Sequence, residues 1–257
     1  MIIREVVTMI FNIHAGHNPD GRVASGAVGL IKESTEARII KNHVVEYLQR
    51  AGHTVYDCTV DDAKSIADVL NKIVTKCNSH AVDVDVSIHL NSGANDESGN
   101  GKSTGVEVLV YSDNSKVKDE AQRICNNLAT LGFKNRGVKY RPDLYFLRNT
   151  KAPALLIEVC FVDDADDVNI FNNNKAKIGK LIAEALINES INIKPVNFKV
   201  RVNTELNIRS GAGTNYPVVG VIKDYGTYTI VDTSGNWGKL KSGVGWINIS
   251  EKYVSRV

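Results

Sequence analysis

The sequence predicts an α/β domain with a mostly parallel twisted sheet, followed by a small all-β domain. Up to about residue 190, apolar strand-like segments alternate with amphipathic helical segments, which is typical of a sheet flanked by helices. Beyond Ile191, helical periodicity ends, and short β-rich segments are separated by glycine-bearing turns. We therefore assign residues 1–190 to the α/β domain, 191–198 to a linker and 199–257 to the small all-β domain.

The spacing of apolar residues and the residues that begin and end each segment predict the individual elements. Apolar or alternating segments predict strands at 6–13, 53–58, 82–89, 105–112, 144–148 and 153–162. Apolar spacing of three and four predicts helices at 34–51, 62–77, 116–132 and 172–190. Ser34 or Thr35 is expected to cap the first helix and Asp61 or Asp62 the second, because short polar side chains accept from free backbone N–H groups. In the β domain, strands are expected at 199–202, 206–210, 216–222, 227–234, 237–240 and 245–249.

The composition is that of an ordinary globular protein, with 43% hydrophobic and 23% charged residues. The net charge of +2 argues against a nucleic-acid binder. No apolar run approaches the roughly 20 residues that a membrane-spanning helix needs, so no membrane insertion is expected. The first residues do not read as a signal peptide, because Glu5 interrupts them, and we expect synthesis in the cytoplasm. The four scattered cysteines are read as reduced thiols.

Side chains that can bind a metal or transfer a proton lie at or near the expected strand ends. His17 follows the first strand, His89 ends the third, Glu158 lies in the last, and Glu33 stands where the first helix begins. Functional groups in an open α/β sheet collect at the carboxyl ends of its strands. Histidines in such positions can bind a metal, transfer a proton or simply pack. Glu158 is the least easily explained by packing, because a carboxylate in an apolar strand is costly unless it is paired or functional.

These four residues are the inventory of a catalytic zinc site. Such a site has three protein ligands, an open position for water and a nearby general base. His17, Glu33 and His89 are the candidate ligands of one Zn²⁺ ion, and Glu158 is the candidate acid/base.

Four motifs across residues 9–188 resemble the zinc-dependent N-acetylmuramoyl-L-alanine amidases of bacterial autolysins and phage endolysins. They are His-Ala-Gly-His17-Asn-Pro, Gly29-Leu-Ile-Lys-Glu33, Ser87-Ile-His89-Leu-Asn91 and Leu147-Arg148-Asn-Thr-Lys-Ala-Pro153-Ala-Leu-Leu-Ile-Glu158-Val-Cys-Phe161. The resemblance implies that His17, Glu33 and His89 bind zinc and that Glu158 is the catalytic acid/base. The chain departs from the family at three places. The family often has Asp in place of His14, Gly in place of Cys160, and Asn in place of Asp163 or Asp164.

Several further residues have weaker assignments. Asn91 and Arg148 are candidate substrate-binding residues, since Arg148 can anchor a carboxylate or stabilise an oxyanion, although a surface salt bridge explains it almost as well. His14 is read as a packed or supporting residue rather than a ligand. Cys160 shares the strand face of Glu158 by alternation, and we read it as a small apolar residue lining the site rather than a nucleophile or ligand.

The tail resembles a bacterial SH3 domain. The resemblance rests on Leu206-Asn-Ile-Arg-Ser-Gly-Ala-Gly-Thr-Asn-Tyr216-Pro-Val-Val-Gly220, Asn236-Trp237-Gly-Lys-Leu and Gly245-Trp-Ile. Such domains in lytic enzymes usually bind cell walls, so Tyr216 and Trp237 are candidate wall-binding residues, although residues of this kind mostly belong to the core or turns of a small barrel.

Together these features predict a peptidoglycan hydrolase that cuts the amide between N-acetylmuramic acid and L-alanine. We expect a phage endolysin that acts on a Gram-positive wall after release through holin pores. The alternatives are a zinc peptidase acting on stem peptides and a non-catalytic wall-binding protein. Neither the oligomeric state nor the target species follows from the sequence.

Overall fold

The computed structural model describes residues 8–192, 196–214 and 216–257, and the chain forms two compact units. The first comprises Met1–Ile191 and the second Asn192–Val257. The predicted linker contains residues 193–195, which lie outside the described residues, and its last residue, Phe198, already belongs to a strand. Among the described residues, no helix has both the length and the apolar character needed to cross a membrane.

In its described residues, the first unit is a six-stranded sheet covered by five helices. Its elements in chain order are β1 (Ile10–Ala15), α1 (Glu33–Arg50), β2 (Thr54–Asp57), α2 (Ile66–Cys77), β3 (Val84–Asn91), β4 (Val106–Val110), α3 (Lys118–Ala129), β5 (Asn135–Tyr140), α4 (Tyr145–Asn149), β6 (Ala154–Phe161) and α5 (Ala165–Ile187).

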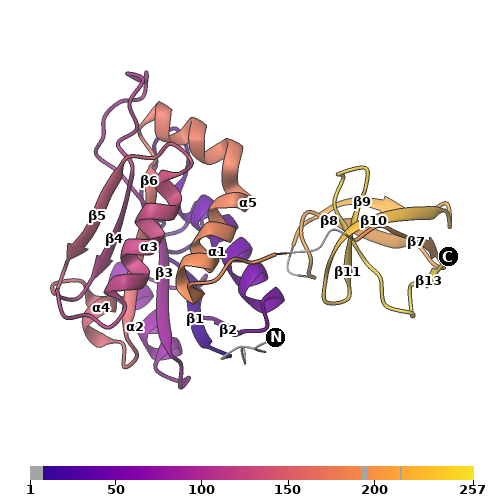
Figure 1. Ribbon diagram of the computed structural model, residues 1–257, viewed down its shortest axis with the longest axis horizontal. Coiled ribbons are helices and arrows are strands. Elements are labelled where there is room, and N and C mark those ends of the chain that lie inside the picture. Colours follow the sequence, from indigo (N-terminus) through magenta and orange to yellow (C-terminus); the bar gives the residue numbers. More distant parts are fainter. Residues whose placement is uncertain (1–7, 193–195, 215) are drawn as a thin grey trace, which may run out of the picture. The chain divides into compact units, whose positions relative to one another are not determined.

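The strand order is β2-β1-β3-β6-β4-β5, and every neighbouring pair is parallel except β4 with β6. Helices α1, α3 and α5 pack together over one face of the sheet, and α2 and α4 pack on the other (Figure 1). Side chains of β4 and β6 join α2 and α4 in one apolar cluster, including Leu109 and Leu156. Because side chains alternate along a strand, Glu158 follows Leu156 onto this same face of β6. The topology therefore turns Glu158 toward α2 and α4.

The structure corrects one predicted strand. Residues 144–148 were expected to be extended, but Tyr145–Asn149 form the short helix α4. Phe146 and Leu147 are both buried in the cluster with α2. A strand would send such neighbours to opposite faces, whereas a helical turn places both against α2.

Two other features were missed or misplaced. Strand β5 was missed because its sequence, NRGVKY, carries almost no apolar alternation and its residues are at most half-buried. Helix α2 begins later than expected and is capped by Ser65, whose side chain accepts from the Asp68 backbone N–H. Asp61 and Asp62 instead pair with Arg38 and Lys72.

The ends of two further helices differ from the prediction. Helix α1 begins at Glu33, and neither Ser34 nor Thr35 is its cap, because the N-cap position falls on Lys32 and carries no side-chain bond. Helix α5 begins at Ala165 rather than 172, with Asp164 as its cap.

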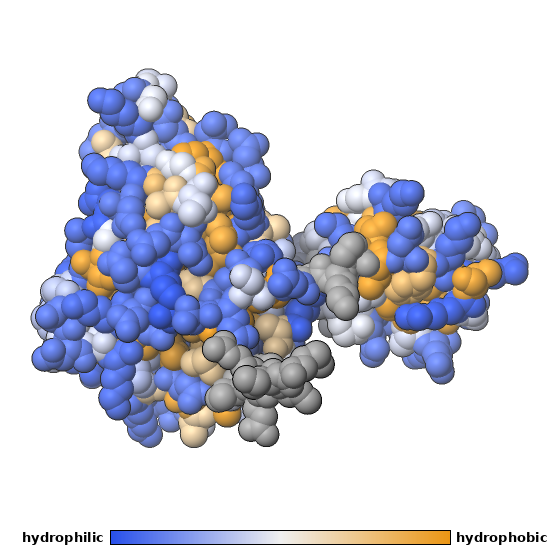
Figure 2. Space-filling model, in the orientation of Figure 1, coloured by the Kyte–Doolittle hydropathy of each residue, from blue (hydrophilic) through white to orange (hydrophobic). Residues whose placement is uncertain are grey.

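The second unit is a small all-β, SH3-like barrel built from antiparallel strands in the order β13-β7-β10-β11-β12-β8-β9. They are β7 (Phe198–Val202), β8 (Leu206–Arg209), β9 (Val218–Ile222), β10 (Thr227–Ser234), β11 (Trp237–Leu240), β12 (Trp246–Asn248) and β13 (Val254–Arg256). Its core cluster consists of aliphatic side chains that come from all seven of these strands. Hydrophobic patches also reach the surface of this unit (Figure 2), and the exposed residues include Val218, Val219 and Val221 of β9.

Candidate active site

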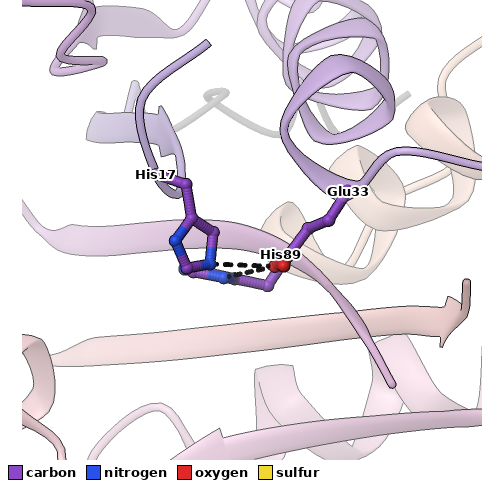
Figure 3. Close-up of side chains that lie close together, drawn as sticks. All are labelled: His17, Glu33 and His89. Carbon is purple, nitrogen blue, oxygen red and sulfur yellow. Dashed lines mark hydrogen bonds and ion pairs between the residues drawn. The ribbon is translucent and has the colours of Figure 1, made fainter. Parts of the chain in front are cut away.

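His17 is placed by an unusual turn directly after β1. The backbone of His17 lies in the left-handed region, with φ of 64°. The next residue, Asn18, is fully buried, and its side chain binds Val23 and both backbone groups of Ala63. These bonds hold the turn, and the imidazole points toward Glu33 and His89 (Figure 3).

Glu33 is the first residue of α1 and is only 4% exposed. Its Oε2 accepts from the Ala27 backbone N–H at 2.8 Å, and its Oε1 faces the Leu90 N–H at 3.3 Å. Glu36, the other acidic residue of the first turn, is instead paired with Lys175 at 2.6 Å. The structure therefore separates the two carboxylates: only Glu33 faces the strand ends.

The three candidate ligands converge on one point. His89 Nδ1 lies 2.8 Å from Glu33 Oε1, and His17 Nε2 lies 3.2 Å from the same oxygen (Figure 3). One ligand atom from each residue lies within 4.8 Å of the other two. Burial alone raises the pKa of the Glu33 carboxyl, but the hydrogen bonds with His17 and His89 outweigh it and hold that pKa well below its usual range.

Two glycines make this convergence possible. A Cβ on Gly16 would lie 2.0 Å from Cε1 of His89, and a Cβ on Gly26 would lie 2.5 Å from Oε2 of Glu33. Neither distance is compatible with a side chain, so any other residue would push the ligand groups apart. Gly26 also has a φ of 81°, which residues with a side chain rarely adopt.

The donor set suits zinc. Two imidazole nitrogens and one carboxylate oxygen are the ligands of many catalytic zinc sites, and three protein ligands leave a position for water or substrate. The carboxylate also supplies negative charge beside the cation. His17, Glu33 and His89 thus fit the metal that the sequence predicts.

Glu158 lies beside this group. It stands opposite His89 in the parallel β3–β6 register and opposite Glu107 in the antiparallel β4–β6 register. Burial, followed by the nearby Glu33 and Glu107 carboxylates, raises the pKa of Glu158 to about 8. Within the described part of the chain, its buried Oε2 has no hydrogen-bond partner. This carboxyl group is thus the strongest acid/base candidate in the structure.

A cavity of about 300 Å³ joins these groups. His17, His89 and Glu158 line it together with apolar side chains of α2 and α4, among them Val69 and Phe146. The arrangement places a prospective metal, an acid/base and an apolar wall around one space, which suits hydrolysis of a bond in a partly apolar substrate.

The two candidate substrate-binding residues lie outside the lining of this cavity. Asn91 donates to Glu107 Oε1 at 3.0 Å, and Arg136 donates to the other oxygen of Glu107 at 2.7 Å. Asn91 thus helps to hold a carboxylate that faces Glu158. Arg148 is exposed on α4. The substrate-binding roles of Asn91 and Arg148 remain predictions.

Arg141 lines the cavity, although the sequence reading had not singled it out. It follows β5 in the stretch Arg-Pro-Asp, a turn signal. Because β5 itself was not recognised, nothing in the sequence marked this arginine as lying at the end of a strand.

His14 and Cys160 are both fully buried. Burial, followed by the neighbouring His89, lowers the pKa of His14 to about 3, so this imidazole is neutral and packs edge-on against Phe146. Burial raises the pKa of the Cys160 thiol well above its ordinary value, which disfavours a thiolate nucleophile. Cys160 does not line the cavity, because the β3–β6 register shifts between His89 and Asn91 and interrupts the alternation that the prediction assumed.

The acidic residues that follow β6 have structural partners. Asp163 accepts from the backbone N–H groups of Gly93, Ala94 and Asn95, and Asp166 accepts from those of residues 100–102. These carboxylates fasten the long loop between β3 and β4 to the start of α5. The departure from the family at this point therefore serves the loop.

In the second unit, Tyr216 and Trp237 are both half-buried. The Tyr216 ring lies so close to Gly211 that a Cβ there would come within 2.4 Å of it, and Arg209 donates to the Tyr216 carbonyl at 2.7 Å. Trp237 begins β11. Their part in wall binding remains a prediction.

Comparison with known proteins assigns the chain to a family. Residues 12–188 match the N-acetylmuramoyl-L-alanine amidase family, and the chain belongs to that family. Residues 204–255 match the bacterial SH3 domain. An uncharacterised protein of Clostridium perfringens is 37% identical over 187 residues, which cover 71% of this chain and 53% of that protein. The chain thus spans little more than half the length of this relative.

Two solved structures extend the likeness. The catalytic domain of the CD27L endolysin targeting Clostridia difficile is 31% identical with a TM-score of 0.63, covering 72% of this chain and 99% of that domain. The catalytic domain of CwlV, an N-acetylmuramoyl-L-alanine amidase from Bacillus (Paenibacillus) polymyxa, is 25% identical with a TM-score of 0.57, covering 70% and 97%. Both likenesses concern the α/β unit.

Proposed function

We propose that the protein is a zinc-dependent peptidoglycan amidase that hydrolyses the bond between N-acetylmuramic acid and the L-alanine of the stem peptide. The observation that carries the proposal is the convergence of His17 and His89 on Glu33 beside the half-buried Glu158, in a chain of this amidase family. A structural role alone does not account for a half-buried carboxyl group whose buried Oε2, among the described residues, has no hydrogen-bond partner next to such a donor set.

His17, Glu33 and His89 would hold the ion through two ring nitrogens and one carboxylate oxygen. Zinc bound there supplies a Lewis acid for the scissile carbonyl and lowers the pKa of water from about 15.7 to about 7. Glu158 accepts the proton of the attacking water and delivers it to the nitrogen of the departing L-alanine. A carboxyl group whose pKa lies near neutral suits both halves of this transfer, since it gains and loses a proton with little cost.

We further propose that the protein is a phage endolysin acting on the wall of a Gram-positive host. The likeness to the CD27L endolysin supports this role. The SH3-like unit would bind the wall and hold the amidase near its substrate. On this proposal the protein accumulates in the cytoplasm and reaches the wall through holin pores.

The direct test is digestion of purified peptidoglycan by the full chain, followed by end-group analysis. We expect new L-alanine N-termini without new reducing sugars, lost on chelation and restored by zinc. New amino groups on other residues would instead favour the zinc peptidase, and reducing ends would contradict both. The absence of any product from walls of several species would favour the non-catalytic wall-binding protein.

A matched variant separates the acid/base from the metal. Glu158→Gln keeps the size of the side chain but cannot accept the proton. We expect it to retain zinc and to lose activity by about 10²–10⁴-fold. An active Glu158→Gln enzyme would contradict the role of Glu158 as the acid/base.

The role of the SH3-like unit is tested by a chain that ends at Ile191, the boundary between the units. This chain should cleave soluble muropeptides at the full rate and intact walls about 10- to 100-fold more slowly, because tethering raises the local concentration of the enzyme. Equal rates on walls with and without the unit would contradict a targeting role.

A further inference from the structure

The cavity beside Glu158 has one fixed positive charge. Among the described residues that line it, Arg141 is the only arginine or lysine. The charges of Arg141 and Glu158 influence each other, and Arg141 opposes the rise of the Glu158 pKa. The guanidinium therefore belongs electrostatically to the catalytic cavity, although it comes from a different part of the chain than the metal ligands.

Arg141 has backbone and side-chain hydrogen bonds within its own turn, and its side chain is 46% exposed. Its backbone N–H donates to the Val110 carbonyl at 2.9 Å, and its own carbonyl accepts from Leu144 at 3.2 Å across a turn that contains Pro142. Its Nε and Nη2 donate to the two oxygens of Asp143 at 2.8 and 2.7 Å. This paired bond lowers the pKa of the Asp143 carboxyl to about 2.

The bond to Asp143 uses one edge of the guanidinium and leaves other donors available. Arginine has five N–H groups in a planar fork, and the Asp143 pair occupies two of them. An arginine fixed along one edge loses little conformational freedom when it binds an anion through its remaining donors. Arg141 is thus built to receive an acidic group that enters the cavity.

The chemistry of the substrate identifies that group. The carboxyl of muramic acid is consumed in the scissile amide, so the sugar side offers no anion there. On the peptide side, L-alanine presents a methyl group, which the apolar wall of Val69, Ile73 and Phe146 can contact. The next residue is D-glutamate, joined through its γ-carboxyl, so its α-carboxylate is the first anion beyond the cleaved bond. In many walls this group is amidated to D-isoglutamine.

We propose that Arg141 binds the α-carboxylate of the second stem residue and makes the enzyme select stems with D-isoglutamate over stems with D-isoglutamine. This inference rests on the proposed amidase function. It adds a specificity-determining residue and names the chemical form of the substrate. Discrimination arises because an amide carries no charge and places an N–H₂ donor opposite a guanidinium that has only donors.

The test measures binding and cleavage separately. Zinc-loaded full chain carrying Glu158→Gln is titrated calorimetrically with MurNAc-L-Ala-γ-D-Glu-L-Lys and with its D-isoglutamine counterpart. We expect the acidic ligand to bind about 10-fold or more tightly, since charge-assisted arginine–carboxylate bonds are among the strong ones. Adding Arg141→Gln should abolish this ratio by weakening the acidic ligand alone.

Lys139→Gln is the matched control. It removes one positive charge from β5, close in sequence to Arg141. Both side chains are exposed, but Lys139 does not line the cavity. We expect this variant to keep the ratio between the two ligands. Arg141→Lys should restore it only in part, because an ammonium cannot reproduce the planar fork. Unchanged thermal unfolding of the Arg141 variants would show that the fold is intact.

Equal binding of the two ligands by the parent chain would overturn the inference, as would equal weakening of both by Arg141→Gln. Cleavage by the chain with Glu158 intact is scored independently. A preference that depends on Arg141 without any amidase product would uphold the inference and refute the proposed activity. Amidase product with no preference in binding would do the reverse.

Discussion

The two units of the chain bury different kinds of side chains. In the described residues, every buried polar or charged side chain belongs to the first unit, including His14, Glu33, Asp85 and Glu107. The SH3-like unit buries an aliphatic core with no such group. A carboxylate or imidazole without water is costly, and only an extensive apolar framework can support several of them.

The two units therefore differ in where their polar and ionisable side chains lie. Among the described residues, the large sheet holds Glu158 without a hydrogen-bond partner at Oε2 and brings three candidate ligand side chains together. Among the described residues of the small unit, the polar and charged side chains are at least partly exposed, whereas Trp246 is buried. The contrast predicts that substitutions in the two units will damage different properties.

The largest effect is expected at the metal site. His89→Ala removes a candidate ligand nitrogen. On the proposed function it should abolish stoichiometric zinc and lower amidase activity at least about 10³-fold, because both the Lewis acid and the activated water would be lost. Metal content after dialysis and muropeptide cleavage measure this. His43→Ala, on α1 and away from the cavity, is the control and should retain both. Full zinc content in the His89 variant would remove it from the ligand set.

A core truncation in the second unit should affect stability but not chemistry. Ile230 is completely buried in β10, and Ile230→Ala should cost about 2–5 kcal/mol by the lost contacts and the cavity left behind. Thermal unfolding should show one shifted transition, with the rate on soluble muropeptides unchanged. Val219→Ala, at a position 48% exposed, should change stability by less than about 0.5 kcal/mol. A loss of soluble-substrate activity in the Ile230 variant would contradict the independence of the units.

The smallest expected effect is a dependence of stability on pH. Without metal, the pKa of Glu158 rises from 4.5 to about 8 on folding, so the folded chain holds this proton more tightly than the unfolded chain. The resulting stabilisation is complete below about pH 4.5 and is lost as the pH rises through about 8. Chelated protein should therefore unfold more easily at pH 9 than at pH 6, by at most about 1.4 kcal/mol for each pH unit.

Glu158→Gln is the control for this titration, because it cannot ionise. The depressed pKa of Glu33 adds nothing in the same interval, since its stabilising effect is lost only as the pH falls well below 4.5. Denaturant unfolding of both chelated proteins at pH 6 and pH 9 gives the comparison. An equal pH dependence in the two would mean that Glu158 does not hold its proton near neutrality.

Local pattern was sufficient for most of the fold. Strands with apolar runs, such as β3 and β6, and helices with apolar spacing, such as α1 and α3, lie close to the predicted ranges. Two elements were not predicted, for different reasons: β5 carries almost no apolar alternation, and the conformation of the short helix α4 depends on what it packs against. Phe146 and Leu147 do not distinguish strand from helix until α2 lies beside them.

The sequence by itself determined the division into an α/β domain and a β domain, the four motifs of the amidase family, and the candidate ligands His17, Glu33 and His89 with Glu158. Only the tertiary structure decided that these residues meet at one point and that Gly16 and Gly26 leave room for them. It also brought Arg141 into the cavity and turned Cys160 away from it. The reason is physical: motifs record which groups a chain carries, but burial, register and the proximity of charges arise only when distant strands are aligned side by side.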